Sequence, residues 1–114
     1  MYDETIISTS KIGQRLDAIV KNEQVSYLQF SNKKITLVSQ ITIGRSTDNS
    51  VVIDSKLASR HHALIQKIKE EYFLKDLDST NGTFLNGQRI SGGKYYKLSA
   101  GDKITIGKTD LVMS

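Results

Sequence analysis

The sequence contains no cysteine and no proline, and each absence narrows what the chain can be. Without cysteine there is no disulfide, no thiolate ligand for a metal and no cysteine nucleophile, although this fits any compartment. No apolar run approaches the ~20 residues that a membrane-spanning helix needs. The first residues also lack the positive start and the apolar core of a signal peptide. We therefore expect a cytoplasmic protein that does not enter a membrane.

Length and charge leave the class of partner open. The chain has 114 residues, which suits a single domain, and 38% hydrophobic with 25% charged residues is typical of a soluble globular protein. Its formal net charge of +4 is compatible with nucleic acid, anionic lipid or a phosphorylated protein as partner. Because the lysines are scattered from Lys11 to Lys108 without a dense run, charge alone does not choose among these partners.

The chain divides into two parts of different character. Residues 1–24 show no strand alternation, but four of their apolar residues recur at helical spacing: Ile12, Leu16, Ile19 and Val20. This part is expected to form either a short helix or a flexible N-terminal arm. Residues 25–114 are expected to form the folded domain.

From residue 25 onward, short β-type runs are separated by turn residues. The expected strands lie at 27–30, 35–38, 41–43, 51–53, 63–68, 72–77, 83–85, 95–98, 103–106 and 111–113. Asn86-Gly87 predicts a two-residue hairpin, because both positions tolerate the positive φ of a type I′ turn. Without proline, glycine and asparagine supply the tight turns. The regular spacing predicts an all-β sandwich with its binding residues on loops.

Three polar loop clusters each adjoin an apolar strand: Gly44-Arg45, residues 59–63 and residues 78–83. A phosphate group is bound by a fixed guanidinium, hydroxyl donors and free backbone N–H groups. Arg45 directly follows a predicted strand, which anchors its stem, and the other clusters add hydroxyls, a second arginine and an amide. If the three loops meet at one end of the sandwich, they form a shallow anion site.

The motifs in these loops resemble the forkhead-associated (FHA) domain. Four motifs occur here in the same order as in that family. They are Ile43-Gly44-Arg45, Ser59-Arg60-His61-His62-Ala63, Ser79-Thr80-Asn81-Gly82-Thr83 within residues 76–87, and a closing Gly-Asp strand within residues 98–107. The resemblance covers about residues 25–113. It implies a two-sheet β sandwich of about eleven strands, FHA/SMAD-like, with the binding site on loops at one end. It also implies a module that binds phosphothreonine peptides in serine/threonine kinase signalling.

The resemblance further implies which five residues contact the ligand. Arg45 and Ser59 would hold the phosphate, and Arg60, at the next position, would add a phosphate contact. Thr80 would lie beside the threonine methyl, a contact by which the family prefers phosphothreonine to phosphoserine. Asn81 would hydrogen-bond the peptide backbone.

The same resemblance assigns supporting roles. Gly44 is the family's close-packing glycine, Gly82 supports the turn after Asn81, and His62 is its structural histidine, which braces the loop carrying the serine. Leu57 lies where relatives select the third residue after the phosphothreonine. Because Leu57 is apolar, we expect an apolar preference there.

Patterns that suggest other chemistry fail on geometry or spacing. His61 and His62 are adjacent in an extended segment, so they point to opposite faces and do not share a metal ion. The run that starts Asp76-x-Asp78 has Asn81 where an EF-hand loop needs its glycine, and Gly87 where the loop needs its glutamate. Gly101 to Thr109 has the wrong glycine spacing for a P-loop. Without a metal shell, a triad or paired carboxylates in a cleft, we expect no enzyme, no cofactor and no metal.

Other interpretations stay open. A phosphorylation-independent interaction scaffold fits the same fold, and the net charge leaves nucleic-acid binding as a weaker alternative. Our expectation is a monomer that binds a phosphothreonine-containing protein downstream of a Ser/Thr kinase, with neither nucleic acid nor a membrane as partner. Phosphorylation of Thr5 or Thr9 would let the arm occupy its own domain's pocket, as in some small relatives, although a plain linker is the favoured interpretation of the arm.

Overall fold

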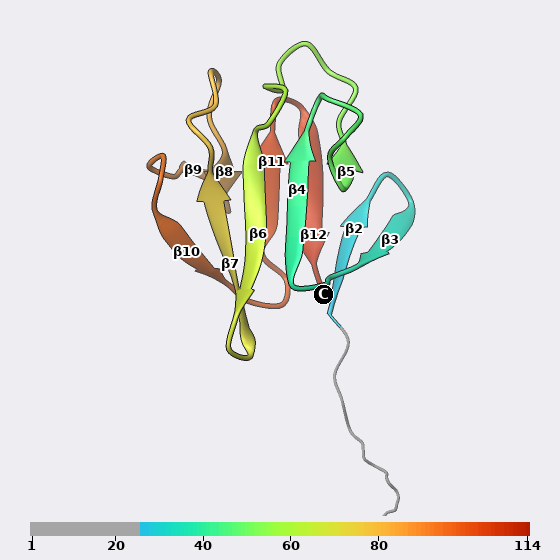
Figure 1. The fold of residues 1–114 in the computed structure, drawn as a ribbon, viewed down its shortest axis with the longest axis vertical. Helices are drawn as coiled ribbons and strands as arrows, with labels where there is room; N and C mark the ends of the chain where they lie inside the picture. Colours follow the sequence, from blue (N-terminus) through green and yellow to red (C-terminus); the bar gives the residue numbers. More distant parts are fainter. Residues whose placement is uncertain (1–25) are drawn as a thin grey trace, which may run out of the picture.

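Two β-sheets packed face to face make up residues 26–114, the part of the chain that the computed structural model describes (Figure 1). The expected N-terminal arm, residues 1–24, lies outside the described residues, and so do Thr5 and Thr9. Within residues 26–114, no helix is long and apolar enough to cross a membrane.

The described part contains eleven strands in two sheets. Their bounds are β2 (Tyr27–Phe30), β3 (Lys33–Thr36), β4 (Gln40–Gly44), β5 (Val51–Val52), β6 (Ala63–Ile68), β7 (Glu71–Asp76), β8 (Phe84–Leu85), β9 (Gln88–Arg89), β10 (Tyr95–Leu98), β11 (Lys103–Ile106) and β12 (Thr109–Met113). One sheet has the order β10-β7-β6-β4-β5, and the other has the order β3-β2-β12-β11-β8-β9. Among the strands of residues 26–114, only β4 and β5 pair in parallel. The predicted all-β sandwich of about eleven strands is confirmed.

Strand bounds agree with the sequence pattern at most positions, and β3 is the clearest exception. The predicted strands at 95–98 and 103–106 have the observed bounds. The prediction of 35–38 is wrong by two residues, because Ser31 and Asn32, at φ 52° and 65°, form a turn so tight that pairing resumes at Lys33. Two lysines therefore begin a strand that carries little apolar signal.

The hairpin predicted at Asn86-Gly87 is confirmed, with φ values of 52° and 86°. It joins β8 to the short strand β9, which the sequence pattern missed because both residues of β9 are polar. The Asn86 side chain also ties the turn to the neighbouring strand. Its oxygen accepts a hydrogen bond from the Lys103 amide at 2.9 Å, and its nitrogen donates to Asp102 Oδ1 at 3.0 Å.

The core lies between the sheets and is almost entirely aliphatic. Inward-facing positions alternate along the strands, as the pleat requires: Ile41 and Ile43 are buried in β4, and Ile104 and Ile106 are buried in β11. Burial of each such side chain contributes roughly 1.5–3 kcal/mol relative to exposure. The resulting double sheet is a rigid support for the loops at its ends.

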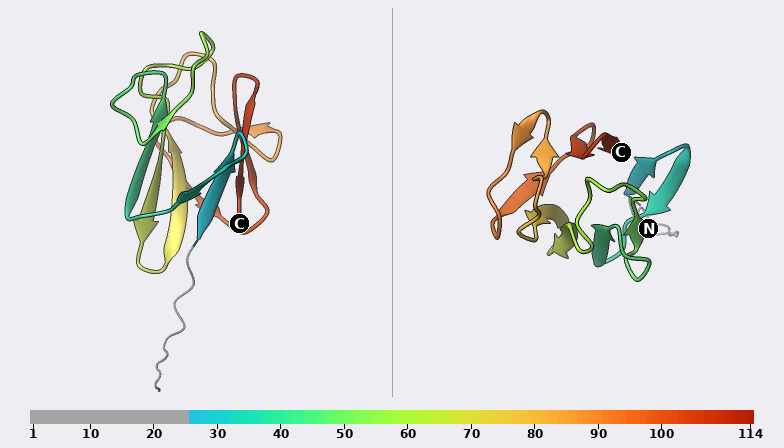
Figure 2. Two further views of the ribbon diagram at one scale, coloured as in Figure 1. Left: turned by 90° about the vertical axis from the view of Figure 1, so that its right-hand side faces the viewer. Right: turned by 90° about the horizontal axis from the view of Figure 1, so that it is seen from above.

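Sheet topology gathers the three polar loops at one end. β6 runs antiparallel to both of its neighbours, β4 and β7, so the ends of β4 and β7 lie beside the start of β6. The loops that follow β4, precede β6 and follow β7 therefore share one end of the sandwich, as the two views in Figure 2 show. The last residue of the chain lies at the opposite end (Figure 1).

We expect Ile65→Ala to lower the free energy of unfolding by about 2–5 kcal/mol, because it leaves a cavity at a position of 0% exposure in the central strand. Urea denaturation measures the change. The matched surface variant Val38→Ala, at a site 55% exposed, should change stability by no more than about 0.5 kcal/mol. Equal losses in the two variants would contradict the assigned core.

Candidate functional site

Arg45 stands at the first position after β4 and is fixed to the loop before β6. Its backbone N–H donates to the Ser59 carbonyl at 2.9 Å, and its side-chain Nε donates to the Ala58 carbonyl at 3.0 Å. These two bonds hold both the backbone and the guanidinium of an exposed arginine. The terminal guanidinium nitrogens make no hydrogen bond to another described residue, so they are available to an anion.

Ser59 is held from two directions. Its hydroxyl oxygen accepts a hydrogen bond from the Thr80 backbone N–H at 3.0 Å, and its own N–H donates to His62 Nδ1 at 3.0 Å. Because Nδ1 accepts, the proton of this neutral imidazole sits on Nε2, which donates to the Gly82 carbonyl at 2.9 Å. Through these two bonds the fully buried His62 joins the loop before β6 to the loop after β7. The Ser59 hydroxyl keeps its proton free to donate.

Thr80 and Asn81 project from the loop after β7, and both are exposed. Asn81 Nδ2 donates to the Leu57 carbonyl at 3.0 Å, which leaves its second N–H and its oxygen for a ligand. Between the loops lies a shallow pocket of about 140 Å³, and its lining residues are Arg45, Lys56, Leu57, Ala58, Ser59, Thr80 and Asn81. The pocket thus brings together four of the five residues expected at the ligand.

Segment 57–60 supports the pocket through its backbone. Each of its four consecutive carbonyls accepts a hydrogen bond from another loop, with these donors: Asn81 Nδ2 to Leu57, Arg45 Nε to Ala58, Arg45 N to Ser59, and Ser46 N to Arg60. The negative ends of these dipoles are therefore neutralised by protein donors. An anion next to the segment meets less repulsion than it would from free carbonyls.

Two glycines allow the loops to approach this closely. A Cβ on Gly44 would overlap the Arg60 carbonyl oxygen, so a side chain there would push the two loops apart. Gly82 has φ 90°, and a Cβ on it would lie 2.6 Å from Nε of Arg89. Gly44 is therefore required for reasons of space, whereas Gly82 is required for its backbone conformation, because the exposed Arg89 side chain can move aside.

The turn that carries Thr80 is built on the carboxylate of Asp76, which is 4% exposed. This carboxylate accepts hydrogen bonds from the Ser79 hydroxyl at 2.5 Å, the Thr83 hydroxyl at 2.6 Å and the Ser79 amide at 3.0 Å. Burial raises the pKa of Asp76, but the hydrogen bonds outweigh burial and hold the pKa below its usual range. The ionised carboxylate therefore organises the loop at neutral pH.

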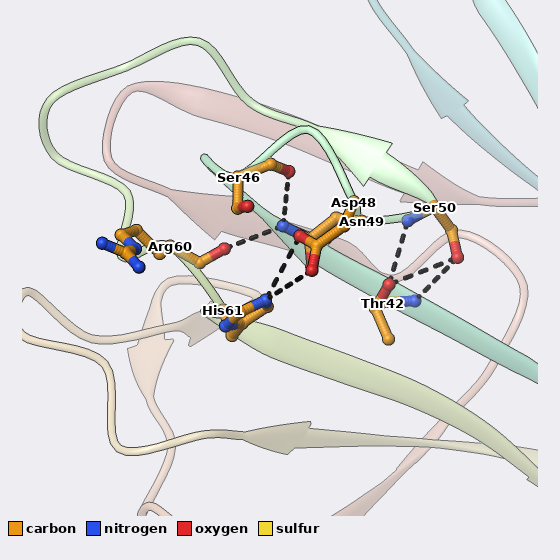
Figure 3. Close-up of polar contacts among 7 residues, drawn as sticks. All are labelled: Thr42, Ser46, Asp48, Asn49, Ser50, Arg60 and His61. Atoms are coloured by element: carbon orange, nitrogen blue, oxygen red, sulfur yellow. Dashed lines mark hydrogen bonds and ion pairs between the residues drawn. The ribbon is translucent and has the colours of Figure 1, made fainter.

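Arg60 and the two histidines occupy different surroundings. Arg60 is exposed but is not among the residues that line the pocket, and its side chain points away from the contacts around Asn49 (Figure 3).

His61 is exposed and its Nε2 lies 3.2 Å from the Asp48 carboxylate, whereas His62 is fully buried. Hydrogen bonds from the Ser46 side chain and from His61 lower the pKa of Asp48. Within residues 26–114, no group of three potential ligands could hold a metal ion.

Lys56 and Ala58 line the pocket on either side of Leu57, in the segment that the family resemblance places at peptide selection. Asn49, by contrast, is not expected at the site from the sequence. Asn49 lies in a run of five polar residues, 46–50, which reads as an ordinary turn. Its role depends on a contact with a carbonyl eleven residues away, and such a contact leaves no trace in the residue pattern.

Comparison with known proteins agrees with this geometry. The family model of the FHA domain matches residues 41–107. The chain is 43% identical over 74 residues to the ABC transporter ATP-binding/permease protein Rv1747 of Mycobacterium tuberculosis, which is 65% of this chain but 8% of that protein. Among solved structures, Mycobacterium tuberculosis EmbR in complex with a low-affinity phosphopeptide has a TM-score of 0.75 and 34% identity, over 81% of this chain and 24% of EmbR.

A second structure comes from an analysis of phosphothreonine-dependent FHA domain interactions. It has a TM-score of 0.72 and 28% identity, and the match covers 79% of this chain and 95% of that one. The chain belongs to the FHA domain family. It spans less than half the length of curated relatives that it matches, such as the transporter and the FhaB protein of Mycolicibacterium smegmatis.

Asp76→Asn should lower the free energy of unfolding at pH 7 by about 1–3 kcal/mol, because the amide leaves a buried donor without its acceptor. Since the pKa of Asp76 is lower in the folded chain than its ordinary value of 3.8, its carboxylate stabilises the fold above that pH. The contribution is lost as pH falls through the folded-state pKa. Urea titrations from pH 7 to pH 3 should therefore show the gap between wild type and Asp76→Asn closing at low pH.

The control for this series is Asp54→Asn, at an exposed carboxylate. It should track the wild type across the pH range. A gap between wild type and Asp76→Asn that stays constant down to pH 3 would show that the charge of Asp76 does not organise the loop.

Proposed function

We infer that this chain binds proteins through a phosphorylated threonine, as a recognition module in Ser/Thr kinase signalling. The observation that carries this function is the meeting of Arg45, Ser59 and Asn81, from three separate loops, around one small pocket. The solved relatives support it, because one holds a phosphopeptide and another was studied for phosphothreonine-dependent interactions. We take residues 25–114 as the binding domain and residues 1–24 as an arm.

The phosphate is received by charge-assisted hydrogen bonds. A phosphothreonine carries about −1.5 to −2 charges at pH 7 and three acceptor oxygens. Arg45 offers its terminal guanidinium nitrogens, and Ser59 offers its hydroxyl proton. Arg60 lies one residue on and adds positive charge at the rim. Because Arg45 and Ser59 are already fixed by the protein, little side-chain freedom is lost on binding.

Thr80 and Asn81 read the amino acid that carries the phosphate. Thr80 lines the pocket and contacts the methyl group that distinguishes phosphothreonine from phosphoserine. Asn81 uses its remaining N–H and its oxygen for the peptide backbone, since its other N–H is bonded to Leu57. The proposal has the domain act as a cytoplasmic monomer that recruits its host protein to a kinase substrate.

The first experiment is a titration with a fluorescent phosphothreonine peptide library. We expect saturable binding by the wild type, weaker binding to phosphoserine peptides and none to unphosphorylated ones. Arg45→Ala removes a charged hydrogen-bond donor, so affinity should fall by about one to two decades. Fluorescence polarisation measures each affinity.

Lys67→Ala is the matched charge control, because it removes one positive charge near the opposite end of β6 and should bind like the wild type. If the folded wild type binds no phosphopeptide, the fold acts as a phosphorylation-independent scaffold, and protein partners and then nucleic acid become the ligands to test. Binding that ignores the phosphate would lead to the same conclusion.

Leu57 should select an apolar residue at the third position after the phosphothreonine. Its side chain lines the pocket and is 40% exposed, so it offers an apolar surface to a peptide that leaves the phosphate site. Leu57→Ala should reduce the discrimination between isoleucine and aspartate at that peptide position by roughly five-fold. The same peptide library measures this ratio, and Val38→Ala, at an exposed site, should leave it unchanged. An acidic preference in the wild type would refute the assignment.

A further inference from the structure

Asn49, in the loop after β4, is a buried polar residue that no ligand contact explains. Its side chain is 8% exposed. Its Nδ2 group donates two hydrogen bonds, one to the Ser46 carbonyl at 2.7 Å and one to the Arg60 carbonyl at 2.8 Å, as Figure 3 shows. The second bond connects the loop of Arg45 to the loop of Ser59.

The orientation of this amide is fixed by its partners. Both neighbours of Nδ2 are carbonyl oxygens, which only accept, so a flipped amide would place Oδ1 against two acceptors. In the observed orientation Oδ1 is buried and finds no hydrogen-bond partner among the described residues. The amide thus makes its two donor contacts although one acceptor, Oδ1, stays without a hydrogen bond. This indicates that the two donor contacts outweigh the cost of the unsatisfied acceptor.

The bridge ends on the Arg60 carbonyl, the last of the four carbonyls in segment 57–60. The Arg60 carbonyl also accepts from the Ser46 backbone N–H at 3.2 Å, so both of its lone pairs are used by the loop after β4. One residue earlier, the Ser59 carbonyl accepts from the Arg45 N–H. Gly44 has no side chain, and a Cβ there would lie 2.9 Å from Asn49 Nδ2, so the glycine leaves room for the bridge.

Other contacts attach the rest of this loop without Asn49. Thr42 and Ser50 exchange hydrogen bonds between backbone and hydroxyl at 2.9 and 3.1 Å, and His61 contacts Asp48 (Figure 3). The first contacts hold Ser50 to β4, and the last one joins Asp48 to the start of the loop segment that enters β6. Loss of the Asn49 side chain should therefore leave the domain folded and loosen only the spacing between the two loops.

We propose that Asn49 is a positioning residue for phosphate recognition, which sets the distance between Arg45 and Ser59 by clamping the Arg60 carbonyl. This rests on the proposed function, since it concerns how the same pocket is prepared for phosphate. Asn49 is not among the residues that line the pocket. Its effect passes through Arg45, whose own bonds to segment 58–59 need the two loops in register.

The test measures phosphothreonine-peptide affinity of Asn49→Ala and of the isosteric Asn49→Asp, each corrected for the folded fraction. Both lose the donors to the Arg60 carbonyl, and we expect each to bind roughly ten-fold more weakly than the wild type. The Arg45 Nε–H signal in NMR spectra should also shift, because its bond to Ala58 is disturbed. The test uses both variants so that the affinity can still be measured if one of them does not fold.

The control is Met113→Ala, which truncates a residue of 4% exposure at the end of β12. It is one residue before the C-terminus, which lies at the end of the sandwich opposite the loops (Figure 1). It should lower stability and leave the affinity and the Arg45 signal unchanged. In an Arg45→Lys background, where the Nε contact is absent, the further effect of Asn49→Ala should shrink to less than about two-fold.

The possible results separate the two claims. Wild-type affinity in a folded Asn49 variant would overturn the positioning role while the proposed function stands. An effect of Asn49→Ala that is undiminished in the Arg45→Lys background would also overturn it. If the wild type itself binds no phosphopeptide, both the proposed function and the positioning role fail.

Discussion

The buried imidazole of His62 makes the contact on which the rest of the site depends. It accepts from the Ser59 amide with one nitrogen and donates to the Gly82 carbonyl with the other. Both loops are thereby fixed to the same rigid ring beneath the pocket. Because the ring has no solvent contact, water does not compete for either bond. The hydroxyl of Ser59 and the turn at Asn81 consequently hold their relative position before a ligand arrives.

Above this ring, the site is assembled from backbone carbonyls as much as from side chains. Segment 57–60 offers four carbonyls, and the surrounding loops satisfy all of them, with the last receiving two donors. The side chains of Arg45 and Asn81 each donate one N–H to this segment and keep their other N–H groups, and the Arg45 backbone N–H donates to it as well. A side chain with one N–H bonded to the protein and the others unbonded is suited to ligand binding. Its position is fixed, and donors remain for the ligand.

The sequence predicted the architecture and the polar clusters because both follow from local patterns. Alternation in 103–106 and the Asn86-Gly87 turn give the strands and a hairpin directly. The shifted β3 shows the limit of this reasoning, since two of its four paired residues are lysines. Asn49 shows a deeper limit. Its importance depends on where the Arg60 carbonyl lies, and the position of a backbone atom cannot be inferred from the residue types.

The size of the pocket limits how the domain achieves affinity. Its volume of about 140 Å³ is well below the ~300–1,000 Å³ of sites that enclose a small ligand. Under the proposed function, such a pocket would take one phosphorylated side chain and leave the flanking peptide on the surface, so apolar burial would contribute less than the bonds to the phosphate. Affinity must come from charge-assisted bonds, which are strong only when their geometry is fixed beforehand. This is why a site with so few ligand contacts is surrounded by so many bonds within the protein.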